Sequence, residues 1–98
     1  MNSRNYKYHI QLSMVQDNNG NSEDLPAPLE FDFENHDDIF RIISFMEENQ
    51  RFEDKQQAIE FAVGLKLFSG TLMKNKDSEL FKDFQPAFIA FMRKLKGK

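Results

Sequence analysis

The chain has 98 residues, a formal net charge of −3 and no cysteine. This length accommodates about one domain, and the lack of cysteine excludes disulfides, thiolate metal sites and a cysteine nucleophile. The 11 phenylalanines supply a large apolar core without polar atoms to satisfy, and so argue against global disorder.

The N-terminal third of the sequence predicts a β-hairpin. Residues 6–14 and 29–34 each alternate apolar and polar side chains, the period of two that is typical of a strand with one buried face. The polar stretch 17–24 and the prolines that follow it have the composition of a loop. We therefore expect an antiparallel hairpin over about residues 5–34, with a first strand longer than the second.

The polar side chains of the two expected strands carry opposite charges. Lys7 and His9 come from the first strand, and Glu30, Asp32 and Glu34 come from the second. In an antiparallel hairpin they share one face, where cross-strand ion pairs stabilise by about a few tenths of a kcal/mol each.

Three helices are expected after the hairpin, at about residues 36–48, 54–74 and 78–96, because apolar residues there recur three and four positions apart. Gly64 lies inside the second, most apolar helix and suggests close approach of another element. The predicted fold is a single α+β domain over residues 1–98, with an antiparallel β-hairpin followed by three helices (ββααα) packed on one face of the sheet. The expected core comprises Ile10, Leu12, Phe31, Phe33, Ile39, Ile42, Phe61, Leu65, Phe68, Phe88 and Phe91.

Polar residues mark the expected helix ends. Asn35 or Asp37 suits the start of the first helix and Asp54 that of the second, since their side chains accept hydrogen bonds from backbone N–H groups. Asn75 suits a helix end, and Asp77 or Ser78 a new start. Pro86 is compatible with the first turn of a helix that begins near Asp83. The preceding turn at Leu80 and Phe81 would then be a short separate helix.

Several segments together resemble one known family. They are residues 33–40, 61–68, 73–76, 80–81, 86–88 and 91–96, above all Asn35-His36-Asp37-Asp38 and Gly64-Leu65-Lys66-Leu67-Phe68. Their order and spacing are similar to those of small bacterial proteins of domain-of-unknown-function family 3861. The resemblance implies an α+β fold, a bacterial source and a cytoplasmic location. It implies no activity and no functional residues, because none is assigned to the family.

His36, Asp37 and Asp38 form the most chemically suggestive cluster. A histidine beside two carboxylates has the side chains of a divalent metal site or a general base. Adjacent helical residues, however, point about a third of a turn apart and do not converge by spacing alone. We interpret the cluster as a helix N-terminus with acids that suit its dipole, and as no more than a speculative surface site. No catalytic, cofactor or metal site is predicted.

Two alternative functions stay open. An enzyme with its site near His36 and Asp37 is one, although the sequence lacks a Gly-x-Ser-x-Gly elbow and a phosphate-binding loop. A nucleic-acid-binding protein that uses the basic C-terminal helix is the other, and the acids of residues 30–34 disfavour it because they repel phosphate.

The charge is unevenly distributed and identifies no partner. Residues 1–49 carry 3 Lys or Arg against 10 Asp or Glu, a charge of −7, whereas residues 50–98 carry 10 against 6, a charge of +4. No apolar run suits a signal peptide or a bilayer span, so we expect a cytoplasmic protein without membrane contact. The favoured function is a small non-catalytic protein-binding or regulatory module, which forms a homodimer through a strand edge or binds another protein.

Overall fold

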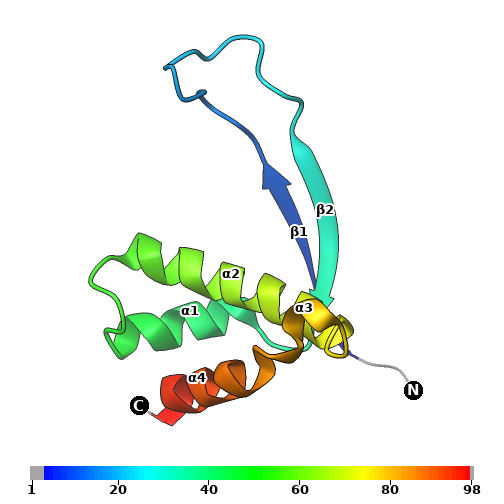
Figure 1. Cartoon of the computed structure of the whole chain (residues 1–98). Coiled ribbons are helices and arrows are strands. Elements are labelled where there is room, and N and C mark those ends of the chain that lie inside the picture. The colour runs from blue at the N-terminus through cyan, green and yellow to red at the C-terminus, as the bar shows by residue number, and fades with distance from the viewer. Residues whose placement is uncertain (1–3, 98) are drawn as a thin grey trace. The chain divides into compact units, whose positions relative to one another are not determined.

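A computed structural model describes residues 4–97 and confirms the α+β class, with a two-stranded antiparallel hairpin followed by helices (Figure 1). The chain divides into two compact units. Residues 1–38 hold the hairpin, and residues 39–98 hold the helices. The expectation that all these elements share a single domain stays a prediction.

The hairpin consists of β1 (Tyr6–Leu12) and β2 (Leu29–Asn35), which are both seven residues long. The expectation of a longer first strand was therefore wrong. Leu12 pairs with Leu29, so one further pair would set Ser13 against Pro28. Proline has no N–H to donate to the ladder, and this explains why β1 ends although its alternation continues to Met14.

Asp17 organises the long loop that connects the two strands. Its carboxylate accepts hydrogen bonds from the backbone N–H groups of Asn19 (2.9 Å) and Asn21 (2.8 Å). These bonds, Asn21 first, hold the pKa of the Asp17 carboxyl below its ordinary value. Gly20 adopts a φ of +87°, which favours glycine, and so completes the turn.

The described part of the second unit contains four helices rather than the three expected. They are α1 (Ile39–Glu48), α2 (Lys55–Lys74), α3 (Glu79–Lys82) and α4 (Gln85–Gly97). The helix expected at 78–96 is thus two helices. Pro86 cannot donate to the carbonyl of Lys82, and the amide of Phe84 bonds to the Phe81 carbonyl (3.0 Å) in a tighter turn.

The first helix begins later than expected, at Ile39 instead of residue 36. The side chain of Asn35 accepts a hydrogen bond from the backbone N–H of Asp37 (2.8 Å). This local turn competes with the helix and delays its start.

The other predicted helix ends are confirmed. The side chain of Asp54 accepts from the N–H of Gln56 at the start of α2, and that of Ser78 accepts from Leu80 at the start of α3. Asn75 ends α2. In the part of the chain that the structure describes, no helix has the length and apolar character to cross a bilayer.

The closed core of the described residues centres on α2, which lies beside α1 and contacts it (Figure 1). Its buried apolar members are Ile39, Met46, Ala58, Ala62, Leu65 and Leu72. Ala58 and Ala62 lie one turn apart on α2, and their short side chains leave room for the side chains of α1. This arrangement confirms that α2 is the central helix of its unit.

Only part of the expected core is buried. Ile39 and Leu65 are buried. Half-buried members are Ile10, Phe33, Ile42, Phe61 and Phe88. Leu12, Phe31, Phe68 and Phe91 are exposed, so their assignment to the core was wrong. A strand pair is a single layer, and the described residues of its unit, 4–38, add only the loop and turns to it.

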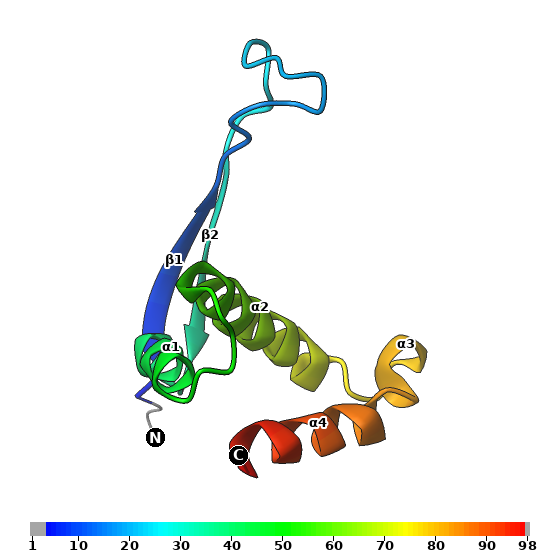
Figure 2. The same cartoon turned by 90° about the vertical axis from the view of Figure 1, so that its left-hand side faces the viewer.

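The C-terminal helix contacts α2 through phenylalanine rings. Phe68 meets Phe84 and Phe88 at centroid distances of 5.9 and 6.2 Å, and Phe61 meets Phe91 at 6.1 Å. The earlier residue of α2, Phe61, contacts the later residue of α4, Phe91, and the later Phe68 contacts the earlier Phe88. The two helices therefore run antiparallel (Figure 2). No residue of α4 is fully buried.

No other element packs closely against Gly64, although its position inside α2 suggested such a contact. A Cβ atom built on it would meet no atom within 4 Å, so no other element approaches it closely. The expectation of close packing at this glycine was wrong, because Gly64 lies on the exposed side of α2.

A candidate interaction surface on the hairpin

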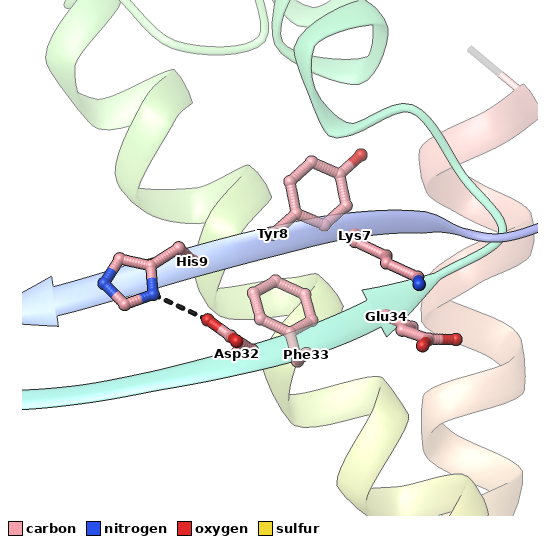
Figure 3. A pocket seen from close by; sticks show the side chains of 6 residues that line it. All are labelled: Lys7, Tyr8, His9, Asp32, Phe33 and Glu34. Carbon is pink, nitrogen blue, oxygen red and sulfur yellow. Dashed lines mark hydrogen bonds and ion pairs between the residues drawn. The ribbon is translucent and has the colours of Figure 1, made fainter.

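The polar face of the hairpin carries a histidine between two carboxylates. His9 Nδ1 lies 2.6 Å from Asp32 Oδ1 (Figure 3). Its Nε2 lies 3.0 Å from Glu30 Oε1. The register also sets Lys7 opposite Glu34. The predicted pairing of opposite charges across the strands is thereby confirmed.

Two carboxylate partners favour the charged form of His9. A carboxylate only accepts hydrogen bonds, so both ring nitrogens donate at once only in the imidazolium form. The hydrogen bonds to Asp32 and then Glu30 raise the pKa of His9 above its ordinary 6.5. The pKa is higher in the folded chain than in the unfolded chain. The stabilisation is therefore fully present below the unfolded pKa and is lost as pH rises through the folded pKa.

This shift can be tested by following the His9 ring by NMR as pH is varied. We expect a pKa above 6.5 in the natural chain and a lower one in Asp32→Asn, which loses the first carboxylate partner. Glu34→Gln removes an acid from the same face that does not bond to His9, and is the matched control. An unchanged His9 pKa in Asp32→Asn would refute the assignment.

The opposite face of the hairpin is aromatic. Tyr8 and Phe33, which are paired across the strands, stack with a centroid distance of 5.2 Å and an interplanar angle of 26° (Figure 3). Phe31 adds a ring 6.3 Å from that of Phe33. The Tyr8 hydroxyl donates to the backbone carbonyl of Asp37 (2.9 Å) and so ties β1 to the turn after β2.

A hollow lies along the paired strands. It is lined by Lys7, Tyr8, His9, Asp32, Phe33 and Glu34. Both ring nitrogens of His9 already bond to neighbouring carboxylates.

His36, Asp37 and Asp38 lie in the turn between β2 and α1, not inside a helix as expected. His36 is exposed, and its Nε2 lies 3.7 Å from Asp37 Oδ1. The backbone of Asp37 serves the turn, since its N–H donates to Asn35 and its carbonyl accepts from Tyr8. Among residues 4–97, no three histidine or carboxylate side chains come together as metal ligands.

The structure adds two long-range side-chain contacts that the sequence did not predict. Tyr8 was expected as an apolar strand residue, and its hydroxyl bond to Asp37 depends on a turn 29 residues away. The side chain of Arg51 donates to the Leu95 carbonyl (2.7 Å) and so holds the end of α4. No local pattern in the sequence signals either contact. The basic residues of the C-terminal helix, Arg93, Lys94 and Lys96, are exposed as expected.

The fold defines a small α+β protein with an N-terminal hairpin and a helical C-terminal unit. The chain belongs to domain-of-unknown-function family 3861, whose model, described as a domain of unknown function with a solved structure, matches residues 6–97. It is similar to the crystal structure of a protein of unknown function from Pectobacterium atrosepticum. The two share 29% identity with a TM-score of 0.81, over 97% of this chain and 100% of the other. No curated protein matches the chain.

Proposed function

We propose that this protein is a non-catalytic protein-binding module that associates with other chains through its hairpin. The observation that carries the proposal is the two-stranded sheet itself. Within the described residues each strand has one neighbouring strand and therefore one edge outside the ladder. Such edges are templates for pairing with another chain, and a hairpin of two strands is marginal without further support.

The exposed apolar side chains at the loop end of the hairpin support the proposal. Leu12 is 66% exposed, and Leu29, its partner across the strands, is 55% exposed. Phe31 is 40% exposed and lies on the same face. Contiguous apolar residues of this kind mark interaction sites more often than they occur on inert surfaces.

The edges of the sheet can pair with another chain even when a second layer covers the aromatic face of the hairpin. Helices packed on one face of the sheet, as the sequence suggests, would cover side chains and leave the backbone edge accessible. We propose this packing of the helices on one face of the sheet, and a cytoplasmic location for the protein.

Sedimentation equilibrium across the micromolar range tests the proposal. We expect a concentration-dependent rise from the 11.6 kDa of one chain toward twice that mass. The physical reason is the gain of a sheet with more than two strands, which is stable where the lone hairpin is marginal. A strict monomer at every concentration would contradict self-association.

A further inference from the structure

We infer that the partner at this site is a second copy of the chain, and that the two β1 strands pair antiparallel about a two-fold axis at His9. The inference rests on the proposed function and adds the partner, the edge and the register. It produces a four-stranded sheet in the order β2–β1–β1–β2. The charges of the hairpin, the alternation of its faces and the length of β1 each support it.

Charge selects the edge of β1 over that of β2. The polar side chains of β2 are Glu30, Asp32 and Glu34, all acidic. Two β2 strands paired about their centre would set Asp32 against its own copy and Glu30 against Glu34. Like charges directly opposite each other destabilise a sheet, so these acids protect the β2 edge from self-pairing.

The polar side chains of β1 are electrostatically more compatible with self-pairing than those of β2. Pairing about His9 sets Lys7 against the neutral Gln11, and His9 against its own copy. Each His9 ring already bonds to Asp32 and Glu30 of its own hairpin, and these two carboxylates offset the positive charge where the two rings meet. Across the four strands, the polar face of the sheet is then acidic on the two outer β2 strands and basic on the two central β1 strands.

The alternation of faces fixes the register. Residues directly opposite each other in an antiparallel pair lie on the same face of the sheet. An axis at His9 pairs all seven residues of β1 and sets Tyr8 against Ile10, and Tyr6 against Leu12. An axis at Tyr8 would shorten the ladder and set Lys7 against His9. The aromatic faces of the two hairpins thus become one continuous apolar surface.

The absence of cysteine makes the register testable with single introduced cysteines. In His9→Cys the two copies of the new side chain lie directly opposite, with Cβ atoms about 4.5–5.5 Å apart, close to disulfide geometry. We expect mild oxidation to convert most of this variant to a covalent dimer. Lys7→Cys is the matched control, because its two copies would lie about 13 Å apart along the strands.

Two further samples keep the result independent of His9. A mixture of Lys7→Cys and Gln11→Cys should cross-link between the two variants, since these positions are opposite each other. Asp32→Cys reports on the β2 edge and should stay uncross-linked. Far-UV circular dichroism of the reduced variants checks that each is folded.

The outcomes separate this inference from the proposed function. If the natural chain dimerises while neither His9→Cys nor the mixture cross-links, the β1 register is wrong and self-association stands. Cross-linking of Asp32→Cys alone would move the interface to β2. A natural chain that stays monomeric in sedimentation overturns both.

Discussion

Replacement of Leu72 by alanine is expected to lower the free energy of unfolding by about 2–5 kcal/mol, the largest effect of any single substitution considered. Leu72 lies on α2 with 0% of its surface exposed. Its truncation loses the transfer free energy of the removed carbons and leaves a cavity that close-packed neighbours fill only in part. For a domain with a total stability of about 5–15 kcal/mol, this loss is a large fraction.

Met73→Ala provides the matched control. Met73 is the next residue on the same helix, has a similar volume and is 63% exposed. Its truncation should change the free energy of unfolding by no more than about 0.5 kcal/mol. Urea denaturation of both variants, followed by circular dichroism at 222 nm, the standard helix band, measures the difference. Equal destabilisation by the two substitutions would disprove the core assignment.

Replacement of Phe68 by alanine is expected to release α3 and α4 from α2. The Phe68 ring contacts Phe81 of α3 at 6.1 Å, and it also contacts Phe88 of α4 and Phe84 in the turn just before α4. Aromatic pairs of this geometry contribute about 0.5–1.5 kcal/mol each beyond the buried area. Because Phe68 is 40% exposed, we expect a total loss of about 2 kcal/mol, less than the roughly 3–5 kcal/mol for a fully buried phenylalanine.

The loss should be concentrated in the C-terminal helices. We expect backbone amides of residues 85–97 to exchange with solvent faster in Phe68→Ala, while those of α1 keep their protection. Phe45→Ala is the control, since Phe45 is also a phenylalanine, is 44% exposed and makes none of the ring contacts described above. Unchanged amide exchange in α4 of the Phe68 variant would show that other contacts hold this helix.

Local interactions explain the features that could be predicted from the sequence. The capping side chains of Asp54 and Ser78 bond to amides two residues away, so the pattern alone predicts them. Alternation along the strands likewise placed Lys7 and His9 on the polar face. Pro86 also acts locally, and a stricter use of its missing N–H would have divided the last helix correctly.

Other features depend on elements distant in the chain. β1 ends at Leu12 because the hairpin register brings Pro28 opposite the next residue. The same register decides that His9 bonds to Asp32 and Glu30, whereas the sequence offered three acids as partners. The hydroxyl of Tyr8 reaches Asp37 only through this pairing.

The sequence by itself determined the α+β class, the faces of the strands, the capping residue Asp54 and the central position of α2. Periodicity and capping depend on neighbours within a few residues, and the sequence contains those neighbours. The tertiary structure alone decided which apolar residues are buried. Small side chains such as Ala58 and Ala62 are enclosed where α1 and α2 meet, and larger phenylalanines remain at the rim. Burial depends on what another element places against a side chain, and no local pattern records that.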